Sequence, residues 1–262
     1  MKQRGIFYGL IVFAVALLAN IFVSSLLQYY LGSFGLALGE ALFGVIAILF
    51  IYFFGLDIKS VLTYRLPSIG EFFAAFVTFL GFYTLALSVS SFISAFSTSL
   101  EAYSENITAV ATSMSPLTAV IVIALLPAIF EEMLFRGLIQ YCFAGIENEY
   151  LRFFLVGLLF GIMHIYPSKI AITLIIGIGA ALIREKTDSI LLCTIFHFLV
   201  NLMSVYAIFK NAQAAESAAI PPSSYIITGF IYLAFSIPII LFGIKKLNSI
   251  EENKKSDNIS DK

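Results

Sequence analysis

The sequence predicts an all-α protein that forms a polytopic transmembrane helical bundle of about eight helices, and three observations support this fold class. Of the 262 residues, 60% are hydrophobic and only 12% are charged, whereas a soluble globular domain carries roughly 45–50% apolar and about 25% charged residues. The apolar residues are grouped into runs, and a helix crosses a bilayer with about 20 such residues. The Lys and Arg residues collect in alternate loops. We therefore expect the bilayer to be the main solvent of this chain.

Eight apolar runs, separated by charged residues, Gly, Pro or Ser, are the predicted helices. The first follows a basic start without the cleavage site and polar domain of a secretory signal, so we expect it to be retained. The fourth carries two adjacent glutamates. The fifth and sixth are short for a hydrocarbon core of about 30 Å, so we expect them to be steeply packed among their neighbours. The predicted helices are residues 6–31, 36–54, 72–96, 117–141, 151–165, 170–183, 190–209 and 225–244.

The distribution of Lys and Arg predicts the orientation of the chain, because these residues collect in cytoplasmic loops. With the N-terminus inside, all of the 15 Lys and Arg residues except Lys169 and Lys210 fall on the cytoplasmic side. Arg136 is counted there although it lies within the fourth helix. We expect a multi-pass protein of the cell membrane with both termini in the cytoplasm.

The predicted organisation is a single transmembrane domain over residues 1–247, followed by a polar, disordered cytoplasmic tail over 248–262. A net charge of −1 argues against a nucleic-acid partner, which would require a basic face. Cys142 and Cys193 both lie in apolar surroundings. We interpret them as small buried hydrophobic residues rather than a disulfide or a metal pair.

Two adjacent glutamates in the fourth predicted helix require an explanation, since an ionisable group at the membrane centre costs about 2.5–3.5 kcal/mol on insertion scales. Glu132 and Arg136 are four residues apart, so they share a helix face and can neutralise each other. Glu131 points about 100° away and has no such local partner. We interpret Glu132 as structural and Glu131 as available for chemistry.

The only two histidines, His164 and His197, also lie in predicted membrane helices, four residues after Phe160 and four before Asn201 respectively. At 1.5 Å per residue, Glu131 and the two histidines lie about 10–20 Å from the inner ends of their helices. We therefore expect the three side chains to meet at a similar depth. The alternative is a structural role, in which each histidine only forms hydrogen bonds that join helices.

This set suits water-driven acyl transfer, with a carboxylate base, an imidazole that orients the water, and imidazole and amide donors for an oxyanion. The sequence has no Gly-x-Ser-x-Gly nucleophile motif. A zinc site formed by Glu131, His164 and His197 is an alternative, with a water in the open position. No His-Glu-x-x-His pair lies on one helix, and both metal-free and zinc-assisted mechanisms stay open.

Three ordered motifs resemble the CAAX protease and bacteriocin-processing family of intramembrane proteases, also called the CPBP or Abi family. The family motif Glu-Glu-x-x-x-Arg matches Glu131 to Arg136, Phe-x-x-x-His matches Phe160 to His164, and His-x-x-x-Asn matches His197 to Asn201. The resemblance covers about residues 117–205. It implies an intramembrane endopeptidase in which Glu131 is the general base and His164 helps to hold the water.

The resemblance further implies that His197 and Asn201 form the oxyanion site and that Glu132 and Arg136 are supporting charges. Family members trim prenylated C-termini or take part in bacteriocin maturation or self-immunity, so a peptide or a membrane protein is the expected substrate. The family has been described both as metal-dependent and as glutamate-type. Two other functions are kept as alternatives, a proton-coupled transporter and a non-catalytic scaffold or immunity protein. The sequence leaves the oligomeric state open.

Overall fold

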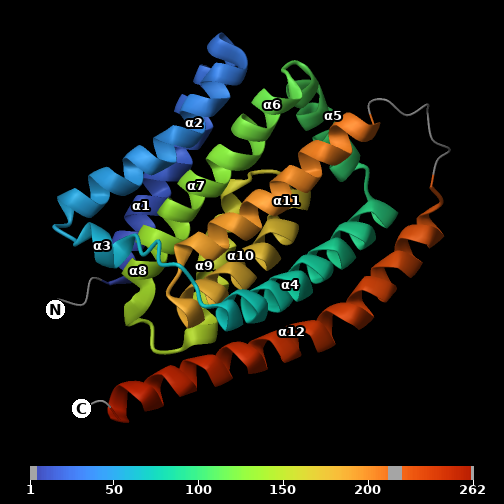
Figure 1. The fold of residues 1–262 in the computed structure, drawn as a ribbon. Helices are drawn as coiled ribbons and strands as arrows, with labels where there is room; N and C mark the ends of the chain where they lie inside the picture. The colour runs from blue at the N-terminus through green and yellow to red at the C-terminus, as the bar shows by residue number, and fades with distance from the viewer. Residues whose placement is uncertain (1–4, 212–219, 261–262) are drawn as a thin grey trace. The chain divides into compact units, whose positions relative to one another are not determined.

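The computed structural model describes residues 5–211 and 220–260, and these are helical almost throughout, with no strand in either range (Figure 1). Within these two ranges, six helical segments are long and apolar enough to cross a membrane. The predicted all-α transmembrane fold is confirmed. The six segments are Ile6–Phe53, Ile69–Phe96, Pro116–Gly145, Pro167–Thr187, Ile190–Lys210 and Pro222–Asn253.

The chain divides into two compact units, each built from three separated segments, whereas the sequence predicts one domain over residues 1–247. Unit 1 contains Met1–Thr63, Glu101–Arg152 and Cys193–Ala219. Unit 2 contains Tyr64–Leu100, Phe153–Leu192 and Ile220–Lys262. Three of the boundaries fall inside helices, because α5 (Ser99–Thr112), α9 (Glu149–Met163) and α11 (Ile190–Asn211) each begin in one unit and continue in the other.

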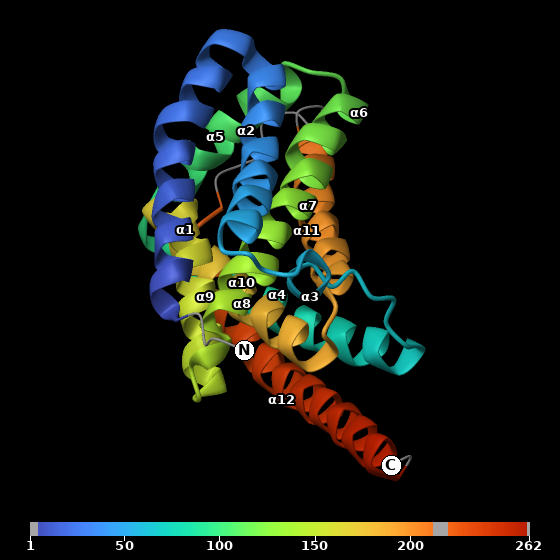
Figure 2. The ribbon, with the colours of Figure 1, turned by 90° about the vertical axis from the view of Figure 1, so that its left-hand side faces the viewer.

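Unit 1 begins with a helical hairpin. The first arm consists of α1 (Ile6–Leu18), the π-helical turn η1 (Ala19–Ser24) and the start of α2 (Ser25–Phe53). The second arm is the rest of α2. The chain reverses at Gly32, whose φ of 57° and ψ of −131° interrupt the helix (Figure 2). Only glycine adopts such a conformation without strain. The two arms correspond to the first two predicted helices, which are therefore confirmed as separate.

The second segment of unit 1 contains one element that the sequence did not predict, α5 (Ser99–Thr112). Its polar composition resembled a loop. The predicted helix over 117–141 is present as a nearly continuous helical stretch with two π-helical parts. It consists of α6 (Pro116–Ala119), η2 (Val120–Leu125), α7 (Leu126–Glu132), η3 (Met133–Ile139), α8 (Gln140–Cys142) and the 3₁₀ turn η4 (Phe143–Gly145).

Unit 1 also contains a short capped helix and two buried cysteines. Asp57 caps α3 (Ile58–Val61), because its carboxylate accepts hydrogen bonds from the Ser60 amide at 2.9 Å and hydroxyl at 2.7 Å. The Ser60 hydrogen bonds hold the pKa of Asp57 below its usual range. Cys142 and Cys193 are both buried, and no disulfide joins them. This confirms the prediction that they are small buried hydrophobic residues.

Unit 2 is built around α4 (Ile69–Phe96), with α10 (Pro167–Thr187) and α12 (Pro222–Ser260) packed along it. Glycines on α12 and α10 allow these two helices to approach α4 closely. A Cβ on Gly243 would lie 2.5 Å from the Thr78 hydroxyl, and one on Gly179 would lie 2.7 Å from the Phe82 ring. All eight predicted helices thus have counterparts, and the fifth, α9, is short with 15 residues.

Two boundaries in unit 2 differ from the prediction. The sixth helix, predicted over 170–183, is a full span of 21 residues, because the polar stretch after Ile183 stays helical until Asp188 adopts a left-handed φ of 52°. Arg184 pairs with Asp188 at 2.5 Å. Further, α12 continues to Ser260 and so covers most of the tail predicted to be disordered. An ion pair of 3.0 Å between Lys186 and Glu251 accompanies this extension.

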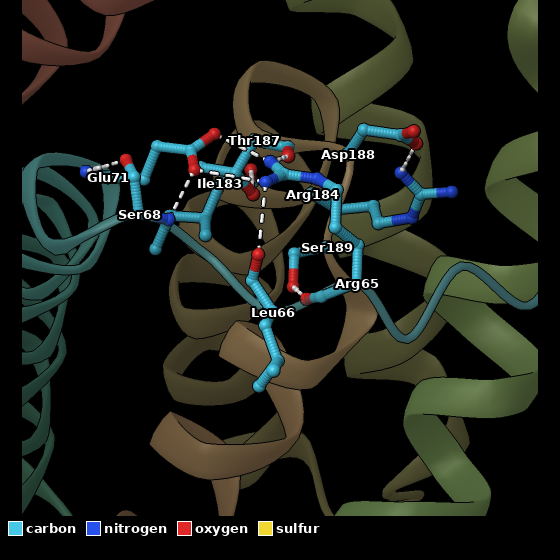
Figure 3. Close-up of polar contacts among 9 residues, drawn as sticks. All are labelled: Arg65, Leu66, Ser68, Glu71, Ile183, Arg184, Thr187, Asp188 and Ser189. Atoms are coloured by element: carbon cyan, nitrogen blue, oxygen red, sulfur yellow. Dashed lines mark hydrogen bonds and ion pairs between the residues drawn. The ribbon is translucent and has the colours of Figure 1, made fainter.

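A cluster of polar contacts ties the segment before α4 to the end of α10 (Figure 3). Arg65 forms an ion pair with the fully buried Glu71 at 2.5 Å and also donates to the Thr187 carbonyl. The Ser189 hydroxyl donates to the Arg65 carbonyl at 2.7 Å. The Glu71 hydrogen bond raises the pKa of Arg65. Because Ser68 and Glu71 also form a capping box, this cluster fixes where α4 begins.

The hairpin of unit 1 generates a test of packing. A Cβ on Gly35 would lie 1.9 Å from the backbone oxygen of Leu27, so Gly35→Ala should open the turn. We expect a loss of about 1–3 kcal/mol or more in the free energy of unfolding, measured by thermal unfolding in detergent. Gly145→Ala is the matched control, since no atom lies within 4 Å of a Cβ there. Equal unfolding temperatures for the two variants would contradict the hairpin geometry.

Candidate active site

The paired glutamates lie at the junction of α7 and η3, between two π-helical stretches of one membrane span. A π-helical turn changes the direction in which side chains leave a helix and is common at functional sites. Glu131 is 9% exposed, whereas Glu132 and Arg136 are each 1% exposed. Three ionisable side chains are thus buried within two turns of helix.

Glu132 contacts two cationic or potentially cationic groups. Its Oε1 atom lies 3.1 Å from an Arg136 guanidinium nitrogen, which confirms the predicted i,i+4 pair. The same oxygen lies 2.9 Å from Nδ1 of His197 on α11. Since a carboxylate can only accept, the Nδ1 proton of His197 points at Glu132. Glu132 therefore fixes the ring orientation of His197 as well as balancing the charge of Arg136.

Glu131 faces the other nitrogen of the same imidazole. Its Oε2 atom lies 3.9 Å from His197 Nε2, which is too long for a direct hydrogen bond. This carboxylate oxygen is buried and accepts no hydrogen bond from any residue in the described parts of the chain. Glu132 Oε2 is buried without a donor in the same parts of the chain, but Glu132 contacts Arg136 and His197 through Oε1. The structural role of Glu132 and the chemical role of Glu131 stay predictions.

Asn201 lies one helical turn beyond His197 on α11, half-buried and in the same unit. The structure thus places Glu131, Glu132, Arg136, His197 and Asn201 in unit 1. The oxyanion role of Asn201 stays a prediction.

His164 and Phe160 belong to unit 2, and the meeting of His164 with Glu131 stays a prediction. Locally, His164 Nδ1 lies 3.0 Å from the Phe160 carbonyl oxygen, so this nitrogen carries the proton that is donated. The two rings stack edge-to-face with centroids 5.1 Å apart. The next residue, Ile165, has a φ of 64°, which is strained for a β-branched residue and often marks a functional position.

Sequence reasoning missed one residue, Glu40 on α2. It is the only charged residue between Ile6 and Phe53, and its Oε2 atom is buried without a hydrogen-bond donor among the described residues. Its helix, α2, packs against α7, which carries Glu131. A lone carboxylate in an apolar span is by default a functional candidate, and that signal could have identified it.

The predicted zinc ligands are divided between the units. Glu131 and His197 are neighbours in unit 1, and His164 is in unit 2. No group of three or more His, Cys, Asp or Glu side chains that could hold a metal was found over the residues described. In both histidines Nδ1 donates to an oxygen, an arrangement that typically leaves Nε2 to bind a metal. Zinc binding therefore stays a prediction.

Comparison with known proteins agrees with the motifs. Residues 113–203 match the family described as Rce1-like, type II CAAX prenyl endopeptidase. The matched segment contains every residue of the three motifs, and it confirms the resemblance to the CAAX protease and bacteriocin-processing family. Comparisons with curated proteins and with solved structures found no match.

The position of Glu132 between two partners predicts the effect of removing it. Glu132→Ala takes the anionic partner from the buried Arg136, and breaking a buried pair costs about 3–5 kcal/mol. We expect loss of folded protein, measured as monodisperse yield and unfolding temperature in detergent. Glu132→Gln keeps an acceptor for His197 and should be less destabilised. Glu101→Ala, at an exposed position of α5, is the control. A Glu132→Ala protein with the wild-type unfolding temperature would contradict this assignment.

Proposed function

Because residues 113–203 match a family of CAAX-type membrane proteases, we propose that this protein is an intramembrane endopeptidase that hydrolyses a peptide bond with water activated by Glu131. The observation that carries the proposal is the position of the Glu131 carboxylate. It lies 3.9 Å from an imidazole that Glu132 orients, within a membrane span. A carboxylate buried beside an imidazole, yet not tied to it, can accept a proton from water.

In the proposed reaction, Glu131 takes a proton from water as the water oxygen attacks the carbonyl carbon of the scissile bond. His164 helps to hold this water. Its Nδ1 donates to the Phe160 carbonyl, so Nε2 is the nitrogen that would face the oxygen atom of the water. Glu131 then passes its proton to the nitrogen that leaves as the C–N bond breaks.

His197 and Asn201 would donate hydrogen bonds to the oxyanion that forms on the carbonyl oxygen. Because Nδ1 of His197 already donates to Glu132, this role requires a second proton on Nε2, which is the imidazolium form. The contact with Glu132 orients the ring for this role.

The proposed substrate is a peptide or membrane protein that enters the span from the lipid, with a prenylated C-terminal peptide as the first class to test. We place both termini in the cytoplasm, where the C-termini of prenylated proteins would be accessible. Processing of a bacteriocin precursor is the second substrate class that the family resemblance implies.

Replacing the proposed base should abolish turnover without unfolding the protein. Glu131→Gln keeps the volume of the side chain but removes the base, and loss of a general base typically costs about 10²–10⁴-fold in rate. The assay is cleavage of a fluorescent farnesylated peptide, and of a pool of bacteriocin-precursor peptides, by protein in liposomes. Glu105→Gln, exposed on α5, makes the same charge change as a control. Wild-type cleavage by Glu131→Gln would refute the assignment.

Elemental analysis separates the two mechanisms that the sequence left open. We propose the glutamate-type mechanism, so active protein purified in detergent should retain its rate after chelation and contain less than stoichiometric zinc. If zinc is bound, Glu131, His164 and His197 would hold it, and it would lower the pKa of a bound water to about 7. Activity that falls with chelation and returns with zinc alone would establish the zinc-assisted mechanism instead.

A further inference from the structure

Glu40 lies on the face of α2 that packs against the helix of the paired glutamates. It precedes Gly44 by one helical turn, so the two residues share a face. A Cβ on Gly44 would lie 2.4 Å from the Phe130 ring, and Phe130 is the residue before Glu131. The absence of a side chain at Gly44 therefore lets α2 approach α7 closely, and Glu40 lies on this packed face one turn from Gly44.

The surroundings of Glu40 do not explain it as a structural residue. Buried polar atoms are normally hydrogen-bonded, and an unsatisfied one is destabilising. The structural carboxylate of unit 2, Glu71, follows this rule, since it is paired with Arg65 and bonded to the Ser68 amide. In contrast, Glu40 Oε2 is buried and receives no hydrogen bond from the residues that the structure describes.

Glu131 has the same unmet requirement at the same place. It is more than nine-tenths buried, and its Oε2 atom likewise receives no hydrogen bond within the described residues. Glu40 and Glu131 lie on two helices that pack against each other beside Gly44 and Phe130. Two buried acceptors on packed helices can be satisfied by one molecule with two donors, and water has two O–H groups that can point to two acceptors.

We propose that Glu40 is a second catalytic carboxylate of this site, which accepts one hydrogen bond from the attacking water while Glu131 accepts the other. The inference rests on the proposed hydrolysis by Glu131. With both O–H groups directed at carboxylates, a lone pair of the water oxygen points away from them toward the carbonyl carbon. Holding a reactant in this attack geometry is a large source of rate acceleration.

The step balances with the groups named. The C–O bond forms as the proton on the Glu131 side moves to Glu131, and the second proton of the water stays on the new hydroxyl, hydrogen-bonded to Glu40. When the C–N bond breaks, Glu131 gives its proton to the leaving nitrogen. Glu40 neither gains nor loses a proton over the cycle, and its role is to direct the water.

Two substitutions of similar size test this role. Glu40→Gln keeps an oxygen that accepts a hydrogen bond, and Glu40→Met fills the same space without that oxygen. For the farnesylated peptide in liposomes, we expect Glu40→Met to lower kcat by about 10²-fold with little change in KM. Glu40→Gln should stay within about tenfold of wild type. The unfolding temperature of Glu40→Met should equal or exceed that of wild type, because an unsatisfied carboxylate has been removed.

Glu71→Met is the matched control for a buried structural carboxylate. It should lower the unfolding temperature and the folded yield, while the kcat of the folded fraction stays at the wild-type value. The proposal is overturned if Glu40→Met turns over at the wild-type rate, if Glu40→Gln is as slow as Glu40→Met, or if both variants lose folded protein as Glu71→Met does.

Glu131→Gln, measured in the same way, distinguishes failure of the Glu40 role from failure of the proposed function. If Glu131→Gln is inactive and Glu40→Met is fully active, only the role of Glu40 fails. If Glu131→Gln also cleaves at the wild-type rate, the proposed function fails, and the role of Glu40 fails with it.

Discussion

A charge inside an apolar span must be balanced within the protein, and the Glu132 carboxylate is where this constraint is met. One of its oxygens serves both Arg136, from the same helical stretch, and His197, from α11. Neither contact can be altered alone, because the three groups share one buried position. The direction of the His197 ring, and hence what Glu131 faces, depends on this shared oxygen.

The backbone around the pair provides the second condition for the site. The π-helical stretches before α7 and after Glu132 widen the helix where two adjacent carboxylates must point to different partners. Glu132 is directed toward Arg136 and His197 Nδ1, and Glu131 toward His197 Nε2. On α2, Gly44 lets the two helices come close beside Phe130. The result is a buried carboxylate in electrostatic contact with its neighbours, yet without a hydrogen bond from the described residues to its outer oxygen.

The two units use buried carboxylates in opposite ways. In unit 2, Glu71 is fully buried but saturated by Arg65 and Ser68, and it serves to fix the start of α4 and the end of α10. In unit 1, Glu40 and Glu131 are not saturated in this way. The contrast supports the proposal that Glu71 holds helices whereas Glu40 and Glu131 direct a water molecule. Burial by itself would not distinguish them.

Local spacing allowed much of this protein to be predicted from its sequence. The eight apolar runs, the Glu132–Arg136 pair and the stacking of Phe160 on His164 all follow from the helical repeat, which places residues four apart on one face. Predictions failed where polar sequence is nonetheless helical, in α5, at the end of α10 and along α12. In α10 and α12 polar side chains form pairs, Arg184 with Asp188 and Lys186 with Glu251, which hydropathy does not register.

The sequence by itself determined the candidate residues and the family that their motifs resemble, because motif spacing and the helical repeat are local properties. Only the tertiary structure decided that His197 is oriented by Glu132, 65 residues away, and that the helix of Glu40 packs against the helix of Glu131. Such contacts depend on how helices pack, and packing is set by side-chain volume at distant positions, as the missing side chain of Gly44 beside Phe130 shows. No periodicity within one helix records which helix will lie against it.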